Sequence, residues 1–249
     1  MTSCCPDTRV PALAPGTDYK AKGTFVKVTD EAGKELRCYK VGEGKNAVVV
    51  VNDVFGVDSG RHLGFCDAVA DMMKCVVVCP DTFRGDVATM EMLGKPEFVE
   101  FLRRHPFEQV AQDLDNVYKN VVGDAEQIAL AGFCWGTWVN FKEAARKAEP
   151  RIKGGGNFHP SFAIEQAFDG TIEAIVAGNS LPMLVAACKD DSEQVKKGGL
   201  LDDAEMYTLH TFEEENHGFM TQGDVNIEQV KEDVKKGLDL FKSFLEKIW

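Results

Sequence analysis

The stretch IALAGFCWGTWVN, residues 128–140, places Cys134 between Gly132 and Gly136, where an apolar, strand-like run passes into a helical pattern. In a strand–turn–helix junction of the form G-x-nucleophile-x-G, the nucleophile occupies a strained turn, and the glycines remove side chains that would collide with the neighbouring strand and helix. The positive end of the helix dipole favours a thiolate there. The pattern predicts a nucleophilic Cys134, and the alternative is a small buried hydrophobic residue in a tight turn.

A nucleophilic thiol needs a base, and the base needs an orienting carboxylate. The segment AACKDD follows a predicted strand and places Asp190 and Asp191 at its carboxyl end, and EENHGFM places His217 in a loop before the last helix. Either aspartate is a candidate to orient the imidazole, although Asp191 or Ser192 is also a candidate to cap the next helix while Asp190 points inward. The backbone N–H of Trp135, beside Cys134, is positioned to hold an oxyanion.

Four other histidines have other expected roles. His159, in NFHPS, ends a predicted strand, and the carboxyl ends of parallel strands are where such sheets place groups that contact ligands. Pocket lining and a satisfied turn histidine are both open for this residue. His62 and His105, in apparently solvated segments, and His210, within a strand, are expected to be structural.

Short β-branched runs alternate with helical patterns from residue 46 onward, which is typical of βαβ units and a mainly parallel sheet. The first two strands are expected to form an antiparallel hairpin at the sheet edge. The eight predicted strands span residues 23–28, 36–41, 46–51, 75–80, 127–133, 153–158, 182–188 and 206–212.

Helices are predicted between these strands: one capped by Asp58 or Ser59, one near residues 106–121, and one from 136 to about 148. The segment 84–104 fits either a helix or an excursion over the site. The last helix carries an apolar stripe expected to lie on the sheet. The stripe comprises Ile227, Val230, Val234, Leu238, Phe241, Phe244 (or Leu245) and Ile248.

The composition bounds the class of protein. A chain of 249 residues with 44% hydrophobic residues fits one α/β domain, and we expect an extended tail over residues 1–22 followed by a single domain over 23–249. The net charge of -12 argues against binding to nucleic acid or to anionic membranes. No apolar run approaches the roughly 20 residues of a membrane span, and the N-terminus lacks a signal-peptide pattern, so a cytoplasmic location is expected.

The eight cysteines form no CxxC pair and no zinc-type spacing, which indicates reduced thiols and no metal site.

The chain resembles the dienelactone hydrolase family of the α/β-hydrolase superfamily, from about residue 20 to the C-terminus. The resemblance is carried by VNDVFGVD, PDTFRG, GFCWG, ACKD and HGF, and CCP near the start and FHPS are similar to features of the family's eukaryotic branch. It implies an α/β-hydrolase fold, with a mostly parallel sheet of about eight strands and helices on both faces. It also implies hydrolysis of a small-molecule ester or lactone, with no cofactor.

Residue by residue, the resemblance assigns Cys134 as the nucleophile, His217 as the base and Asp190 as the orienting acid. The backbone N–H groups of Val54 and Trp135 would form the oxyanion hole.

Two positions depart from the family pattern. Bacterial members carry a glutamate that holds the resting thiol, and here Asp53 stands in its place, one methylene shorter. Those members also bind the substrate's carboxylate with two arginines. Arg84 matches one of them, offset by a residue, whereas Thr221 stands where the second would be. The departures bear on the substrate more than on the chemistry.

The residue type of the nucleophile narrows the substrate. A thiolate attacks carbonyls well but also leaves well, so a tetrahedral intermediate with a poor leaving group returns to starting material. Activated esters and enol lactones avoid that difficulty.

A non-catalytic binding protein is the alternative function from another class. A class I glutamine amidotransferase is less favoured, because its His-x-Glu pattern is replaced here by His217-Gly218-Phe219.

Overall fold

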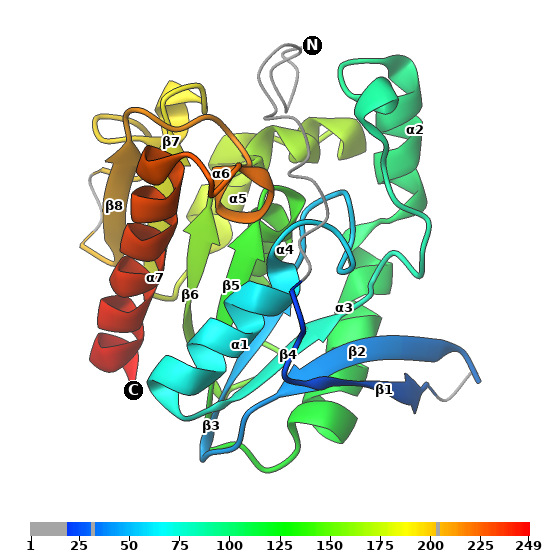
Figure 1. The fold of residues 1–249 in the computed structure, drawn as a ribbon. Coiled ribbons are helices and arrows are strands. Elements are labelled where there is room, and N and C mark those ends of the chain that lie inside the picture. The colour runs from blue at the N-terminus through cyan, green and yellow to red at the C-terminus, as the bar shows by residue number, and fades with distance from the viewer. Residues whose placement is uncertain (1–18, 31–32, 203–204) are drawn as a thin grey trace.

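The computed structural model describes residues 19–30, 33–202 and 205–249. Within these ranges, eight strands form one sheet in the order β1-β2-β4-β3-β5-β6-β7-β8 (Figure 1). All eight predicted strands are confirmed, each to within one residue at either end. The strands are β1 (Thr24–Thr29), β2 (Glu35–Val41), β3 (Asn46–Val51), β4 (Val76–Pro80), β5 (Gln127–Phe133), β6 (Ile152–Phe158), β7 (Met183–Cys188) and β8 (Tyr207–Phe212).

The sheet is parallel from β4 through β8, and the antiparallel hairpin β1–β2 is added at its edge next to β4, as predicted. The register pairs Val51 at the end of β3 with Gly132 of β5, and Phe133 of β5 with Phe158 of β6. Cys188 of β7 pairs with Phe212 of β8. The carboxyl ends of these five strands therefore lie along one edge, and the residues that follow them are brought together there.

Helices cover both faces of the sheet (Figure 1). α1 and α7 lie in front of it in this view, while α3, α4 and α5 lie behind. Apolar side chains on each strand alternate between the two faces, so the core divides into two clusters. The helices are α1 (His62–Met73), α2 (Pro96–Arg104), α3 (Phe107–Val117), α4 (Trp135–Arg146), α5 (Ile172–Gly178), α6 (Phe219–Gln222) and α7 (Glu228–Ile248). The protein thus has an α/β-hydrolase fold.

Some helix boundaries differ from the predictions. α1 begins at His62 with Arg61 as its N-cap, so neither Asp58 nor Ser59 caps it. The turn at residues 60–61 separates Asp58 and Ser59 from the first residue of the helix. The ambiguous segment 84–104 holds a 3₁₀ turn, η1 (Met90–Met92), followed by α2.

The predicted apolar stripe of the last helix holds only in part. Phe241, Phe244 and Leu245 are buried against the sheet, as expected. Ile227 is 55% exposed, because it is the N-cap residue with an extended backbone and does not follow the helical period.

The predicted tail falls mostly on residues 1–18, which lie outside the described residues. Of the residues that follow, Tyr19 and Lys22 are exposed but hydrogen-bonded to α1. The Tyr19 hydroxyl donates to Asp67 of α1 at 2.6 Å, and the Lys22 backbone N–H donates to the same carboxylate at 2.8 Å. A domain boundary at residue 23 stays a prediction. In the ranges that the structure describes, no helix is both long enough and apolar enough to cross a membrane.

Candidate active site

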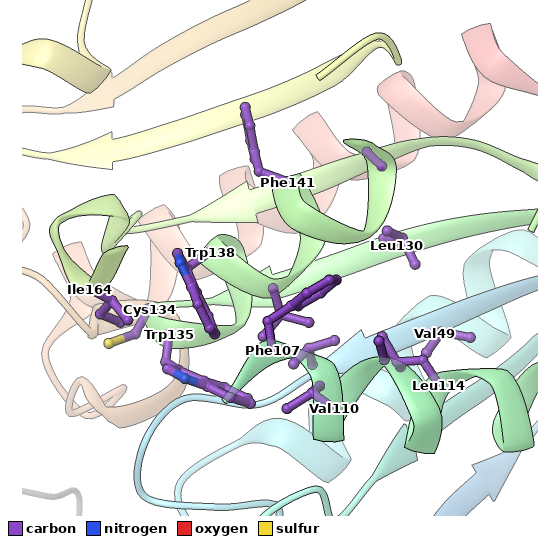
Figure 2. Close-up of a cluster of buried hydrophobic side chains, with 14 of the residues drawn as sticks. Val49, Phe107, Val110, Leu114, Leu130, Cys134, Trp135, Trp138, Phe141 and Ile164 are labelled. Atoms are coloured by element: carbon purple, nitrogen blue, oxygen red, sulfur yellow. The ribbon is translucent and has the colours of Figure 1, made fainter. Parts of the chain in front are cut away.

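Cys134 occupies the sharp turn between β5 and α4. Its backbone has φ 52° and ψ −114°, a conformation that costs a non-glycine residue on the order of 1–3 kcal/mol. The surrounding structure holds the turn, since the Cys134 N–H donates to the carbonyl of Phe158 at 3.1 Å. Figure 2 shows the Cys134 side chain at one end of the aromatic cluster, beside Trp135 and Ile164, with its sulfur directed away from the cluster.

The two glycines of the elbow are required by close backbone approaches. A Cβ atom on Gly136 would lie 2.2 Å from the carbonyl oxygen of Val51, at the end of β3. A Cβ atom on Gly132 would lie 2.6 Å from the Gly136 oxygen and equally near the Asn140 amide of α4. The predicted reason for the G-x-C-x-G spacing is therefore confirmed.

The imidazole of His217 is held by Asp191. Its Nδ1 lies 2.6 Å from Asp191 Oδ1, and the other carboxylate oxygen of Asp191 accepts the Cys188 N–H at 2.6 Å. The expectation that Asp190 orients the imidazole is wrong. Asp190 accepts the backbone N–H of His217 at 2.7 Å, because the turn after β7, closed by Asp191 N–H to Cys188 O, directs the two consecutive side chains differently.

The environment of His217 favours its protonated form. Burial alone disfavours the charge, but the charges of Asp191 and Cys134, together with hydrogen bonds to both, raise the pKa of His217 well above its usual value. Nδ1 of the ring faces the Asp191 carboxylate, and the Cys134 sulfur interacts with the same ring. The imidazole of His217 therefore lies against the Asp191 carboxylate and Cys134, in surroundings that favour its protonated form.

A serine that the sequence analysis did not single out also lies at this point. Ser161 Oγ is 3.3 Å from Cys134 Sγ and 3.5 Å from His217 Nε2. It follows β6 by three residues, at the edge that carries the other site residues. Its only sequence signal was its place at the end of FHPS.

Comparison with known proteins identifies the family. A model of the dienelactone hydrolase family matches residues 37–249, which is most of the chain. The chain belongs to the dienelactone hydrolase family. As a member of that family it is a carboxylic ester hydrolase.

Solved structures agree on the fold. The putative dienelactone hydrolase from Klebsiella pneumoniae is 19% identical with a TM-score of 0.67, over 90% of this chain and 98% of that one. The dienelactone hydrolase-like promiscuous phosphotriesterase P91 from metagenomic libraries is 16% identical with a TM-score of 0.65, over 92% and 99%. An esterase from Pyrobaculum calidifontis is 18% identical with a TM-score of 0.60, over 90% and 85%. A comparison with curated proteins found no significant match.

The two N–H groups that the family resemblance proposes for the oxyanion hole lie at adjacent strand ends. Trp135 is the first residue of α4, so its N–H has no partner within the helix. Val54 follows β3, where its carbonyl accepts Ala88 N–H at 2.9 Å. Its neighbour Asp53 donates its N–H to His62 Nε2 at 3.2 Å. The loop after β3 is thus held by the Val54 carbonyl and the Asp53 N–H, and neither bond uses the Val54 N–H.

His62 is buried rather than solvated as the sequence analysis expected. Its Nδ1 lies 2.8 Å from the carbonyl of Ser59, and its Nε2 accepts the Asp53 N–H. His62 therefore fixes the backbone of the loop that carries Val54.

The two departures from the family pattern contact each other. The Thr221 hydroxyl donates to Asp53 Oδ2 at 2.8 Å, and the Gln222 amide donates to the same oxygen at 2.9 Å. The other oxygen accepts Phe55 N–H at 2.9 Å. Asp53 thus braces α6, the helix that follows His217, against the loop after β3. Its expected role in holding the resting thiol stays a prediction.

His159 lies under the imidazole of His217. The ring centroids are 4.9 Å apart, and His159 has no solvent exposure, so it does not line an open pocket. Burial, followed by the charges of His217 and His62, lowers the pKa of His159 well below its usual value. Neither ring nitrogen has a hydrogen-bond partner among the described residues, so His159 is not a satisfied turn histidine either. Its ring packs against the ring of His217, and its lowered pKa favours the neutral form.

Arg84 does not present a free charge to a substrate. Its guanidinium donates to both carboxylate oxygens of Asp113 in α3, at 2.7 and 2.5 Å, and to the carbonyl of Glu35 at 3.1 Å. The expected role in binding a substrate carboxylate is therefore not supported, because the guanidinium already has a carboxylate partner.

Replacing Arg84 with methionine is expected to lower stability and leave substrate charge preference unchanged. The change leaves the buried Asp113 carboxylate unpaired, which costs about 3 kcal/mol. The ratio of kcat/KM for a carboxylate-bearing ester to that for its neutral analogue should stay within about twofold of wild type. Denaturant unfolding and paired kinetics measure the two quantities. A tenfold fall in the ratio would restore Arg84 to the substrate site.

Proposed function

We propose that the protein hydrolyses activated esters or enol lactones through a Cys134–His217–Asp191 triad and a thioacyl-enzyme intermediate. The observation that carries the proposal is the placement of one imidazole between a thiol and a carboxylate. Its Nδ1 is fixed by Asp191 at 2.6 Å, and the sulfur of the elbow cysteine interacts with the same ring. This is the geometry that a thiol nucleophile and its base need.

In the first step, the Cys134 thiolate attacks the ester carbonyl and forms a carbon–sulfur bond. The negative charge moves to the carbonyl oxygen, where the N–H groups of Val54 and Trp135 stabilise it. Collapse of the intermediate breaks the bond to the leaving oxygen, which receives the Nε2 proton of His217. The products of this step are a thioester on Cys134, a neutral imidazole and the alcohol or enol.

The second step uses the same imidazole as a base. The sulfur of the thioester carries no charge, so one of the causes that raise the pKa of His217 is removed after acylation. Neutral His217 takes a proton from water, and the resulting hydroxide attacks the thioester. The thiolate leaves as the carboxylic acid forms, and the thiolate–imidazolium pair is restored.

The choice of activated substrates follows from the leaving groups. Of the two groups on the tetrahedral carbon, a thiolate departs more readily than an alkoxide. An enolate or aryloxide is stabilised and competes, and an expelled enol becomes a ketone that cannot attack again. Alkyl esters and amides are therefore expected to be poor substrates.

A direct test is to trap the acyl-enzyme. With an activated aryl ester in excess, the protein should release about one equivalent of phenol per chain in a rapid burst, because a stable thioester accumulates before hydrolysis. Mass spectrometry of the acid-quenched protein should show one acyl group, and peptide mapping should place it on Cys134. An acyl group on another residue, with Cys134 not acylated, would overturn the proposal.

A further inference from the structure

Ser161 places a hydroxyl at the reacting atoms. Its oxygen lies 3.3 Å from the sulfur of Cys134 and 3.5 Å from Nε2 of His217, so one group contacts both the nucleophile and the base. The three residues come from loops after β6, β5 and β8. None of the three is more than 4% exposed.

The backbone of Ser161 is tied to the elbow itself. Its N–H donates to Thr137 Oγ1 at 3.1 Å, and that hydroxyl donates to the carbonyl of Cys134 at 2.6 Å. The Ser161 carbonyl accepts Ile164 N–H at 3.2 Å. These contacts use only main-chain atoms of Ser161. Its position therefore does not depend on its hydroxyl, and the hydroxyl can be removed without removing what places the residue.

The burial of the site creates a need for such a group. A thiolate formed among side chains that are at most 4% exposed has little access to water, so its charge must be stabilised by donors of the protein. A hydroxyl can donate one hydrogen bond and accept another at the same time. It adds no charge of its own, so it does not compete with His217 for Asp191.

We propose that Ser161 is a catalytic residue that holds the thiolate–imidazolium pair before substrate binds, an inference that rests on the proposed function of Cys134. The thiol proton resides on Nε2 of His217. The Ser161 oxygen accepts that Nε2–H together with the Cys134 sulfur, and the Ser161 O–H donates to the sulfur. No proton is gained or lost, since the thiol loses the one that the imidazole carries.

The test measures the sulfur directly, without any ester substrate. Iodoacetamide alkylation of Cys134 is followed by mass spectrometry across pH for wild type, Ser161→Ala and Ser161→Thr, with the melting temperature of each variant as a folding check. In Ser161→Ala, the midpoint of the rate–pH profile should move up by about one unit, and the rate at neutral pH should fall about tenfold. Ser161→Thr, which keeps the hydroxyl, should stay near the wild-type midpoint.

Three outcomes would overturn the proposal. One is a wild-type profile in Ser161→Ala. Another is a rate that falls by the same factor at every pH with an unchanged midpoint, since that reports altered access to the sulfur rather than altered charge. The third is an equal shift in Ser161→Ala and Ser161→Thr.

The alkylation experiment and the acyl-enzyme experiment test the role of Ser161 and the proposed function separately. If Cys134 carries no acyl group during turnover but the midpoint moves as expected, Ser161 controls the thiol and the triad assignment fails. If Cys134 is acylated and the midpoint does not move, the triad stands and the role of Ser161 fails.

Discussion

Replacing Cys134 with alanine is expected to lower kcat/KM for an activated aryl ester by about 10⁴-fold or more. The variant keeps the N–H groups proposed for the oxyanion hole and the His217–Asp191 pair, but it has no atom that can form the proposed acyl bond. Only water activated by the imidazole remains as a nucleophile, and it lacks the fixed position that the elbow gives to the sulfur. Steady-state hydrolysis of the ester, corrected for the uncatalysed rate, measures the loss.

Cys75 provides a matched control. Like Cys134 it is a buried cysteine, but it lies just before β4, in the core cluster that packs against α1 and α7. Cys75→Ala should lower stability by about 1 kcal/mol through lost packing and leave kcat/KM within about twofold of wild type. Comparable losses of activity in both variants would indicate a stability effect. Hydrolysis by Cys134→Ala at near the wild-type rate would show that the nucleophile is another residue.

The sheet was predictable because its strands leave a strong local signal. Runs such as NAVVVV and QIALAGF are β-branched or apolar, bounded by polar or glycine-containing turns, and all eight were located. The elbow was predictable for a similar reason, since the two glycines and the cysteine lie within five consecutive residues. Both features leave their signal in residues that are close together in the sequence.

The features that were mispredicted depend on contacts between distant segments. The sequence does not show that Arg84 meets Asp113 of α3, or that the His159 ring packs under His217. Ser161 is 27 residues from Cys134 and 56 from His217, so no spacing rule connects the three. The contacts of Ser161 and His159 become visible only when parallel strands bring their carboxyl ends to one edge.

The choice between the two aspartates failed for a more local reason. Asp190 and Asp191 are consecutive residues of the same type, and the backbone of one tight turn decides which carboxylate faces the imidazole. The closing hydrogen bond of that turn runs from Asp191 N–H to Cys188 O. Family resemblance, carried over by alignment of short motifs, does not fix a one-residue offset in such a turn.

Asp191→Asn is expected to lower kcat/KM by about 10³- to 10⁴-fold, whereas Asp190→Asn should lower it less than about tenfold. Both oxygens of Asp191 accept from donors, one from His217 Nδ1 and the other from Cys188 N–H. An asparagine has only one oxygen, so its NH₂ group must face one of those donors. The arrangement that keeps the Cys188 bond directs the NH₂ group at Nδ1, which then has to be unprotonated. That tautomer puts the remaining proton on Nε2, and a neutral imidazole in this state cannot accept a proton from water.

Asp190 makes one contact that an amide can reproduce. Its Oδ1 accepts the His217 backbone N–H, while Oδ2 has no hydrogen-bond partner within the described part of the chain. Asparagine can keep its oxygen on the N–H and turn its NH₂ group to the other side. Asp191→Asn should also lower the pKa of His217, because the negative charge of Asp191 is one of the causes that raise it. Kinetics of both variants, with an NMR titration of the His217 ring, measure these effects. If Asp190→Asn proves the more damaging change, the carboxylate that orients the base is Asp190, and the contact seen at Nδ1 is not the one used in catalysis.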